Sequence, residues 1–567
     1  MTSDLIQAFS ETVDAKVHTP VYTMHKYFAR RPWNVFNQLI SHYSSPGDIV
    51  LDPFAGGGVT VVESLKLRRK VIGVDVNPLA AYVTLMEVRP LDLSSFEEAF
   101  LRIKSKLKDE IRSLYVTRCE KCDELAIADW IEWNENTQRP IRLKYDCDNC
   151  GNTSRNTASE ADCELAQKID DNFSGLIQQK KLWYPGTAIP AGDKSNSLIK
   201  HEFRFFHELF TKRNLIALAI LFDTIKRLQD SDAREFLKFA FSSSLKWTSR
   251  LSHLRGRIVE GWAMHAYWVY PDSLEMNVWN TFERRTKALM RGKQYSSEHI
   301  GNYCRFAHVF SDIASGAATC LLLNKSSSQL PLPTDSVDVI ITDPPYGGNV
   351  NYGELSDFWW VWLSGGATAD KLHEAVINRT QGKSCDQYEE TLVNVFSECY
   401  RVLKPEKCLV STFNSKDLRV VASFVKAVSI AGFSLHPEGL LYQKPIRPYI
   451  TTFHAMQIGA FVGDFIFTFL KTEVAASAMK IELSDLKRRL DELMVETSKD
   501  EAAETKLRIR VYGAIVPFLA DHAKSDPTAC HEAVNYCEAK IRERNDYFSQ
   551  LRKRMIARRR KKFQRNP

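Results

Sequence analysis

A glycine-rich turn between two strand-like segments is the feature that most limits what this chain can fold into. "DIVLD" at 48–52 is a short apolar run that ends in an acid, and "PFAGGG" follows it directly. Residues 59–69 then have the pattern of a helix, "KVIGVD" at 70–75 is a second apolar run, and Pro78 opens a second helical pattern. This order of strand, turn, helix, strand and helix is typical of the beginning of a doubly wound sheet. The sequence therefore predicts an α/β fold.

The regular alternation stops after about residue 88 and resumes near residue 318. The later strand-like runs are "TCLLLN", "SVDVIIT", "KCLVSTF", "FSLHPEGLLYQKP" and "DFIFTFL". The two regular parts together have the size of one α/β domain, whereas the whole chain of 567 residues is too long for a single core. We therefore predict one core domain that is split by a large insertion. The predicted parts are 1–88 and 318–472 for the two halves of the core, 89–317 for the insertion and 473–567 for a helical C-terminal region.

Three consecutive glycines, Gly56 to Gly58, lie in the turn after the first strand. Without Cβ atoms they let a ligand approach the backbone and leave N–H groups of the next helix accessible. Val59 and Thr60 stand where a phosphate-binding P-loop needs Gly-Lys-Ser or Gly-Lys-Thr, and the G-x-G-x-x-G pattern of dinucleotide folds is absent. S-adenosylmethionine (SAM) and a tight turn without a ligand remain. Asp75 favours the cofactor, because an acid at the end of the second strand suits ribose hydroxyls.

The run "SVDVIIT" is followed by "DPPYGG". Asp343 ends the strand, and a side chain at the carboxyl end of a parallel strand faces the ligand crevice of such a sheet. Pro344 and Pro345 lack N–H donors and keep their carbonyls in fixed directions, so Asp343 and a proline carbonyl can accept both hydrogens of an –NH₂ group. This arrangement favours a pyramidal nitrogen whose lone pair points at a methyl donor. Tyr346 offers a flat face for a base that has left its stack.

The two motifs together predict direct methyl transfer to an exocyclic amine of a base. A strand that merely ends at two prolines is the alternative, and the cofactor-type loop in the same domain argues against it. Methylation at C5 of cytosine is disfavoured, because that chemistry needs a cysteine nucleophile, usually placed after a proline. None of the 12 cysteines follows a proline.

"DPFAGGG" together with "DPPY" resembles the SAM-dependent amino-methyltransferases of DNA, and in particular the adenine-specific DNA methylase family that carries a zinc ribbon. The segments "HKYFARRPWNV" at 25–35 and "NVNYGELSDFWWVWL" after "DPPY" are also similar to that family. The resemblance implies a Rossmann-like sheet of seven strands whose last two form an antiparallel hairpin. One departure lies in "GGGVT", where relatives often have Ser or Thr directly after the second glycine.

The resemblance also implies roles for single residues. The expected catalytic residues, which hold the target base, are Asp343, Pro344, Pro345 and Tyr346. The expected cofactor-binding residues are His25, Asp52, Pro53, Phe54, Gly56, Gly57, Asp75 and Asn77.

Four cysteines form two C-x-x-C pairs, Cys119 with Cys122 and Cys147 with Cys150. Each pair can lie on a tight knuckle, and four thiolates at this spacing close a tetrahedral Zn²⁺ site. Such a site has no open position for a substrate. We therefore predict a structural zinc ion that organises the insertion, in a zinc ribbon at about 117–157. Reduced thiols without a metal are the alternative.

Residues 242–268 of the insertion interleave basic and aromatic side chains. In methyltransferases with this order of motifs, the slot between the two halves of the core holds the target-recognition region. A basic and aromatic surface suits a nucleic-acid groove, whereas a helical core with its charges outside is the alternative. The side chains concerned are Lys246, Trp247, Arg250, Arg255, Arg257, Trp262, Tyr267 and Trp268.

The C-terminal region contains a short leucine repeat with heptad spacing. It is compatible with an amphipathic helix that packs on its own domain and with the seam of a dimer. The residues are Leu483, Leu486, Leu490 and Leu493.

A basic tail closes the chain, with nine Lys and Arg side chains and no acid between Arg552 and Arg565. The formal net charge of the whole chain is +7, so its excess of positive charge is local to this tail. The tail is either a solvated segment or an electrostatic grip on a polyanion, and we favour the second.

The segment after "DPPY" leaves one question open. Asn351 and Glu354 are either base contacts on a closing loop or the start of a core helix. We expect Trp359, Trp360 and Trp362 to belong to such a core helix.

The N-terminal sequence "MTSDLIQAFSETVDAK" lacks the basic start and apolar core of a signal peptide. No uncharged apolar run reaches the length of a membrane helix. We therefore expect a cytoplasmic location.

These observations predict a methyltransferase that acts on the N6 amine of a flipped adenine in DNA, within restriction–modification or phage defence. The alternatives are an enzyme for N4 of cytosine, an RNA amino-methyltransferase of the guanine-N2 type, and a non-catalytic subunit of a defence complex that binds SAM and DNA. The expected partners are DNA and subunits of a defence system, and no membrane. Whether the protein forms a dimer stays open.

Overall fold

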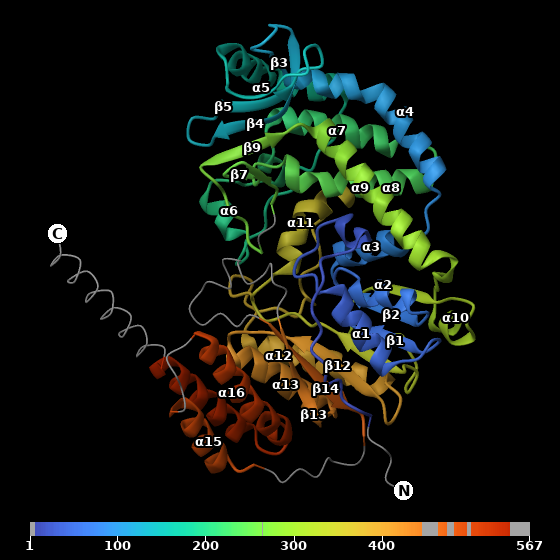
Figure 1. The fold of residues 1–567 in the computed structure, drawn as a ribbon, viewed down its shortest axis with the longest axis vertical. Helices are drawn as coiled ribbons and strands as arrows, with labels where there is room; N and C mark the ends of the chain where they lie inside the picture. Colours follow the sequence, from blue (N-terminus) through green and yellow to red (C-terminus); the bar gives the residue numbers. More distant parts are fainter. Residues whose placement is uncertain (1–5, 263–264, 445–462, 473–480, 496–500, 545–567) are drawn as a thin grey trace, which may run out of the picture.

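The computed structural model of the chain describes residues 6–262, 265–444, 463–472, 481–495 and 501–544. Three tiers follow one another along the long axis of the molecule (Figure 1). The insertion forms one end, the central sheet with its helices lies in the middle, and the C-terminal helices form the other end. The basic tail predicted from the sequence lies outside the described residues.

Seven strands form the central sheet in the order β10, β2, β1, β11, β12, β14, β13. β14 runs antiparallel to both of its neighbours, and the other pairs are parallel. The mixed α/β class predicted from the sequence is confirmed. The strands are β1 (Ile49–Asp52), β2 (Lys70–Asp75), β10 (Cys320–Asn324), β11 (Val339–Thr342), β12 (Cys408–Phe413), β13 (Ser434–Gln443) and β14 (Asp464–Leu470).

β1 lies between β2 and β11 in this sheet. β2 follows β1 closely in the chain, whereas β11 comes from beyond the insertion. In the register, Val50 is paired with Val71 on one side and with Val339 on the other. Residues from both sides of the insertion therefore share one sheet, and the carboxyl ends of β1 and β11 open into the same crevice.

Alternating side chains of the short parallel strands enter two different hydrophobic cores. Val50 and Ile341 lie in one core, and Leu51 and Ile340 lie in the other. A strand that is buried on both faces needs apolar residues at successive positions. This explains why the strand segments of the sequence are continuous apolar runs and do not alternate with polar residues.

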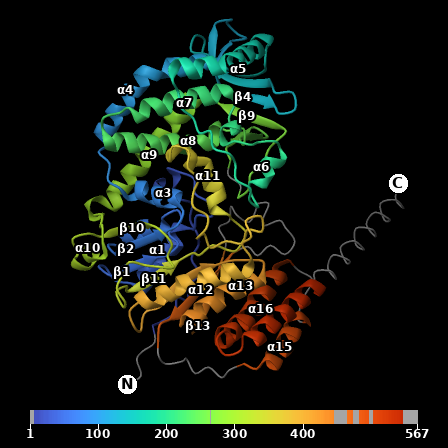
Figure 2. The same ribbon diagram turned by 180° about the vertical axis from the view of Figure 1, so that it is seen from behind.

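Helices cover both faces of the central sheet (Figure 2). The helix after the glycine turn ends at Lys66, a little earlier than predicted, because Arg68 adopts a left-handed conformation (φ 63°) and turns the chain toward β2. The helices on the first face are α1 (Trp33–Tyr43), α2 (Val59–Lys66) and α3 (Pro78–Val88), and those on the second face are α10 (Phe310–Ser315), α12 (Cys385–Val402) and α13 (Leu418–Ala431).

The insertion combines a layer of helices with an antiparallel sheet. The sheet has the order β3, β4, β5, β6, and β9 pairs with β4. Helices α8 and α9 of the insertion pack against α3, and α8 also packs against α11 (Tyr352–Leu363) of the core. The elements from the N-terminus to the end of the insertion, beyond those already given, are η1 (Pro20–Thr23), α4 (Leu93–Arg112), η2 (Ser113–Tyr115), β3 (Val116–Arg118), β4 (Leu125–Asn134), β5 (Arg139–Asp146), β6 (Thr153–Thr157), α5 (Glu160–Lys180), α6 (Asn196–Lys200), η3 (Phe206–Leu209), α7 (Lys212–Lys226), α8 (Ser231–Thr248), β7 (His253–Arg255), β8 (Ile258–Glu260), β9 (Asp272–Met276), α9 (Val278–His299) and η4 (Gly301–Tyr303).

The C-terminal tier is helical and packs on the second face of the core. It contains α15 (Leu483–Val495), α16 (Glu501–His522) and a further helical stretch at 527–544. Leu486 and Leu490 of the leucine repeat are buried in the same hydrophobic core as α13 and α16. These two leucines of the repeat therefore pack within their own chain.

None of the described helices combines the length and the apolar character that crossing a membrane requires.

Candidate active site

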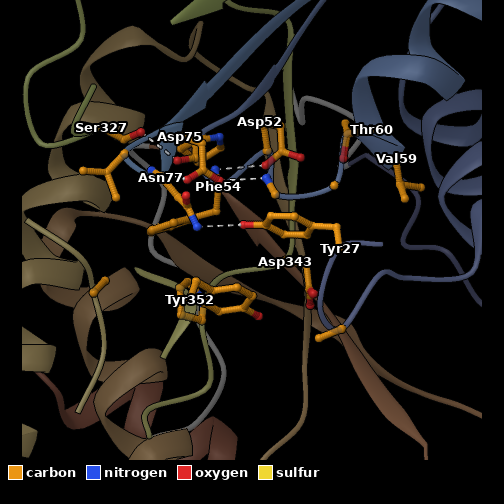
Figure 3. A pocket seen from close by; sticks show the side chains of 18 of the residues that line it. Tyr27, Asp52, Phe54, Val59, Thr60, Asp75, Asn77, Ser327, Asp343 and Tyr352 are labelled. Atoms are coloured by element: carbon orange, nitrogen blue, oxygen red, sulfur yellow. Dashed lines mark hydrogen bonds between the residues drawn. The ribbon is translucent and has the colours of Figure 1, made fainter. Parts of the chain in front are cut away.

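A pocket opens at the carboxyl ends of β1, β2 and β11 (Figure 3). It contains about 860 Å³ of empty space, its open mouth included. The glycine loop lines one part of the pocket, and Asp343 and Pro345 line another. The two sequence motifs therefore meet in a single cavity. The predicted cofactor residues that line it are Asp52, Pro53, Phe54, Gly56, Gly57, Asp75 and Asn77.

Asp75 holds the glycine loop in place from the neighbouring strand. Its carboxylate accepts hydrogen bonds from the backbone N–H groups of Gly56 and Asn77, both at 2.8 Å. The Asn77 side chain in turn caps α3 by accepting from Leu79 N–H at 3.0 Å. Burial raises the pKa of Asp75 to about 6, although both backbone hydrogen bonds oppose the shift. The carboxylate is thus fixed at the pocket wall and is ionised at neutral pH.

Glycine is required in the loop for two separate reasons. Gly58 has a φ of 76°, and a Cβ there would lie 2.8 Å from the Thr84 hydroxyl. A Cβ on Gly57 would lie 3.0 Å from Arg30 Nε, on the side that faces the pocket. Gly56 and Gly57 line the pocket, and the N-terminus of α2 follows the loop immediately.

Asp52 joins the glycine loop to the strand that carries the second motif. It accepts from the Phe54 N–H at 3.1 Å and from the Thr342 hydroxyl of β11 at 2.6 Å. Burial raises the pKa of Asp52 to about 6, and these hydrogen bonds oppose the shift.

Two tyrosines that come from distant segments form an aromatic wall. The rings of Tyr27 and Tyr352 are stacked with their centroids 6.0 Å apart, and both residues line the pocket. Figure 3 shows Tyr27 between Asp343 and the Asp75 side of the cavity. Glu374 also lines the pocket; it accepts from the Gly353 N–H at 2.9 Å, and burial raises its pKa to about 7.

Asp343 lies directly after β11, where the sequence predicted it. Its Oδ1 accepts from the Thr412 hydroxyl of β12 at 2.6 Å and from the Tyr346 hydroxyl, and its Oδ2 accepts from Arg31 Nε at 2.6 Å. Burial raises the pKa of Asp343, and Arg31 opposes this shift. The acid therefore lies in a largely desolvated position with one close cation.

The two prolines of the motif are not equivalent. The Pro345 carbonyl accepts a hydrogen bond from the Tyr388 hydroxyl at 2.6 Å. Pro344 is buried, and no hydrogen bond to its carbonyl is formed among the described residues. The Pro345 carbonyl thus keeps one of its two lone pairs for an incoming amine, whereas the Pro344 carbonyl has no partner among the described residues; of the two prolines, Pro345 is the one that lines the pocket.

Tyr346 lies beside the pocket and is not part of its lining. Its ring meets Phe413 edge-on at 4.6 Å between centroids, and the Arg31 guanidinium lies over it at 4.8 Å.

His25, predicted as a cofactor contact, lies behind the pocket wall. Its ring is stacked on Phe239 with the centroids 5.1 Å apart, and its two nitrogens are close to the Ser242 hydroxyl (3.1 Å) and the Lys26 carbonyl (2.7 Å). Burial lowers the pKa of His25 to about 3. Packing and hydrogen bonding within the protein thus account for this neutral ring, which is not among the lining residues.

Asn351 and Glu354 belong to the interior. Glu354 is 3% exposed, and its carboxylate accepts from Asn351 Nδ2 at 3.0 Å and from the N–H groups of Lys194 and Ser195 at 3.0 and 2.9 Å. These contacts tie α11 to the insertion. Neither residue lines the pocket.

The expected core helix is confirmed as α11. Trp359 and Trp362 are fully buried and Trp360 is half-buried.

The basic and aromatic segment of the insertion is divided between core and surface. Trp262 and Tyr267 are stacked on each other at 4.8 Å and are buried. Trp268 is 57% exposed, and the hairpin of β7 and β8 presents the exposed Arg255 and Arg257. Only part of this segment is therefore open to a nucleic acid.

The four predicted cysteine ligands converge at the end of the insertion. Their Sγ atoms all lie within 4.8 Å of one another, and the closest pairs, Cys119 with Cys150 and Cys122 with Cys147, are 3.6 Å apart. A tetrahedral ion with Zn–S bonds of about 2.3 Å would place its sulfurs about 3.8 Å apart. The cluster therefore has the size and the ligands of a structural zinc site.

Local hydrogen bonds shape this cysteine cluster. Each C-x-x-C pair lies on a turn closed by a backbone hydrogen bond, from Asp123 N–H to Cys119 at 2.8 Å and from Gly151 N–H to Cys147 at 2.9 Å. The Tyr145 hydroxyl points at Cys119 Sγ from 3.8 Å. A donor at this position orients the thiolate and stabilises its negative charge.

Several residues of the site were not expected from the sequence. The signal for Arg31 was present, because it belongs to the segment "HKYFARRPWNV". Tyr352 likewise belongs to the segment "NVNYGELSDFWWVWL". Thr412 and Glu374 carried no comparable signal, since only the packing of distant elements brings them to the site. The missed residues are Arg31, Tyr352, Glu374, Tyr388, Thr412 and Asp464.

The fold and the pocket define an α/β protein with two adjoining ligand positions at the centre of its sheet. One position, at the glycine loop and Asp75, suits a nucleoside-containing cofactor. The other, at Asp343, offers acceptors for an amine.

Comparisons with known proteins agree with this class. Residues 7–85 match a family described as DNA methylase. The chain is 19% identical over 348 residues to the Type II methyltransferase M.MjaII of Methanocaldococcus jannaschii, which covers 59% of this chain and 60% of that protein. It is 39% identical over 70 residues to the DNA adenine methyltransferase YhdJ of Escherichia coli strain K12, which covers 12% of this chain and 23% of that protein. The chain thus spans less than two thirds of the length of either relative. The resemblance to the SAM-dependent DNA amino-methyltransferases is confirmed.

Proposed function

We propose that this protein is a DNA methyltransferase that transfers a methyl group from SAM to the N6 amine of a flipped adenine. The observation that carries the proposal is the shared pocket, in which the glycine loop with Asp75 and the acid of "DPPY" face one cavity. The match to the DNA methylase family and the methyltransferase activities named for the two relatives support it.

The residues at the glycine loop fit SAM. The Asp75 carboxylate is a suitable acceptor for two ribose hydroxyls, and Gly56 and Gly57 line the same pocket. The stacked Tyr27 and Tyr352 offer an apolar wall. When bound, SAM supplies an electrophilic methyl group on a sulfonium.

Asp343 and a proline carbonyl of "DPPY" are the proposed acceptors for the two amine hydrogens. Holding both hydrogens keeps the nitrogen lone pair out of the ring and directs it toward the pocket. Asp343 Oδ2 is also the group that can take up the proton which the amine loses after transfer. Burial raises the pKa of Asp343, which favours this uptake.

The choice of adenine is the finer part of the proposal. It rests on the resemblance of "DPPY" and its flanking segments to the adenine-specific family, and on the adenine activity named for one short match. An enzyme for N4 of cytosine has the same requirement for two acceptors at an amine and is the competing assignment.

The cysteine cluster is proposed to hold one structural Zn²⁺. Four thiolates leave no open coordination position, and the cluster lies in the insertion, away from the pocket residues. Its role would be to fix the ends of β3 to β6.

The decisive experiment is expression in a host without DNA methylation, followed by single-molecule sequencing of the host DNA. The proposal expects N6-methyladenine at one short sequence motif. N4-methylcytosine at a motif would identify cytosine, and not adenine, as the target base. Unmodified DNA together with methylated RNA would favour an RNA methyltransferase. Unmodified DNA and RNA in cells that hold the folded protein would favour a non-catalytic subunit.

The proposal also includes a biological role, in restriction–modification or phage defence. It expects that cells which carry the gene in its native neighbourhood resist infection by phage grown in a methylation-free host. Equal plaque numbers with wild type and with a catalytically dead variant would remove this role and leave the methyltransferase activity untouched.

A further inference from the structure

Arg31 occupies the position that the proposed reaction assigns to the target base. Its Nε donates to Asp343 Oδ2 at 2.6 Å, and its Nη2 donates to the Tyr346 hydroxyl. The same guanidinium lies over the Tyr346 ring, with Cζ 4.8 Å from the ring centroid. One side chain thus takes both the acceptor and the aromatic face that a flipped base would use.

We infer that Arg31 is a displaceable stand-in for the target base, and that it must leave Asp343 and Tyr346 before a base can enter. This inference rests on the proposed function, because it names the target base as the group that replaces Arg31.

The chemistry of the guanidinium supports this view. It is planar, it donates N–H groups in its own plane, and it stacks on aromatic faces. An aminopurine has the same three properties, since its exocyclic N–H groups lie in the plane of a ring that stacks. Arg31 therefore satisfies in the free protein the two groups that the base satisfies in a complex.

The two occupants exclude each other. Asp343 Oδ1 is already used by the Thr412 and Tyr346 hydroxyls, so Oδ2 is the oxygen left for an amine. Arg31 Nε holds that oxygen. The Tyr346 ring also packs against Phe413, and the face on which a base would stack is the one that Arg31 covers.

Asp464 gives Arg31 a second partner when it moves. Arg31 Nη1 donates to Asp464 Oδ1 at 2.9 Å, and Asp464 is the first residue of β14. The Arg31 and Asp464 side chains are 17% and 18% exposed, so this pair lies near the edge of the site. A shift of the guanidinium toward Asp464 keeps its charge paired and releases Asp343.

Release of Arg31 also changes Asp343 itself. While the ion pair exists, the cation weakens the carboxylate as an acceptor. Once Arg31 has moved, the carboxylate faces the amine without a competing cation, in a desolvated position where its hydrogen bonds are stronger.

The experiment measures binding of 2′-deoxyadenosine by calorimetry, with S-adenosylhomocysteine present at saturation so that the nucleoside cannot bind at the cofactor position. Arg31→Ala is expected to bind deoxyadenosine at least about tenfold more tightly than the wild type, because the ion pair no longer has to be broken. The double variant Arg31→Ala with Asp343→Ala is expected to lose this gain. Thr412→Val, which removes one hydroxyl donor from Asp343 Oδ1 and leaves Arg31 in place, is expected to show no gain.

Equal or weaker binding by Arg31→Ala would overturn the inference, since a merely structural arginine gives no gain when it is lost. Melting temperatures of all variants are measured first, and Arg31→Gln, which keeps a polar side chain beside Asp464, replaces the alanine variant if that one does not fold. The result is separable from the proposed function. If the wild-type protein methylates no DNA but Arg31→Ala binds deoxyadenosine more tightly, the proposed reaction is wrong and the role of Arg31 is supported. If the wild-type protein is active but Arg31→Ala shows no gain in binding, only the role of Arg31 is wrong.

Discussion

The Thr342 hydroxyl donates a hydrogen bond of 2.6 Å to the Asp52 carboxylate. The two residues end neighbouring parallel strands that come from opposite sides of the insertion. This bond joins the glycine loop to the strand that carries Asp343, and Asp52 itself lines the pocket.

The first prediction concerns this bond. Thr342→Val removes a donor from a buried carboxylate, which costs about 1–3 kcal/mol and raises the pKa of Asp52 further. We expect a lower melting temperature and weaker SAM binding, measured by scanning calorimetry and by titration calorimetry. Thr391→Val is the matched control, because among the described residues that hydroxyl bonds to the backbone of its own helix alone. Equal losses in the two variants would contradict a special role of Thr342.

The second prediction separates Asp343 from cofactor binding. Asp343→Ala is expected to abolish methyl transfer to unmethylated DNA and to leave the SAM dissociation constant within about twofold, because the acid serves the amine. Asp343→Asn keeps an acceptor oxygen but cannot take up a proton, so we expect it to retain a small fraction of the activity. Asp485→Asn, at an exposed position on α15, is the control. Full activity of the alanine variant in a radiolabel transfer assay would show that Asp343 does not serve the amine.

The third prediction is a pH dependence of cofactor binding. Burial raises the pKa of Asp75 to about 6, so the carboxylate is ionised above this pH and protonated below it. A ribose bound by the ionised form should lose affinity as the pH falls through about 6, by up to about tenfold per pH unit. Titration calorimetry between pH 5 and pH 8 measures this. Because Asp52 titrates in the same range, the test is the comparison with Asp75→Asn, which should bind weakly and with a flatter profile. Parallel profiles would exclude Asp75 as the titrating contact.

The fourth prediction is one zinc ion per chain. Elemental analysis of purified protein should give about one equivalent, and Cys147→Ser should lower it and destabilise the insertion. Cys163→Ser, which alters a cysteine outside the cluster, should change neither quantity. A folded wild-type protein without metal, prepared without chelators, would speak against the site.

The fifth prediction concerns the basic tail. Truncation after Leu551 removes nine Lys and Arg side chains. We expect weaker DNA binding and a shallower slope of log affinity against log salt, because fewer counterions are released. An unchanged slope would mean that the tail does not touch the phosphate backbone.

Local patterns in the sequence predicted much of the fold. The continuous apolar runs at 48–52 and 70–75 correspond to β1 and β2, because strands buried on both faces need apolar side chains at each position. The glycine turn and the two C-x-x-C pairs could also be predicted from the sequence, since each depends on backbone or ligand requirements within a few residues.

Other features could not be predicted because they depend on which distant elements meet. Nothing local in "HKYFARRPWNV" says that Arg31 reaches Asp343, or that His25 turns away to pack against Phe239. The difference between the two proline carbonyls is of the same kind, since the Tyr388 hydroxyl on α12 donates a hydrogen bond to the carbonyl of Pro345. The aromatic residues after Lys246 divided between core and surface for a reason that composition does not contain, namely which of them met α11.

By itself the sequence determined the α/β class, the glycine loop, the acid of "DPPY" and the four cysteines. These depend on periodicity, on backbone freedom and on the spacing of ligands, which are properties of neighbouring residues. Only the tertiary structure decided that Thr342 binds Asp52, that the Tyr388 hydroxyl binds the Pro345 carbonyl, and that Arg31 lies over Tyr346. The physical reason is that each of these contacts joins side chains whose relative position is fixed by the packing of several elements at once, and no single segment of the chain carries that information.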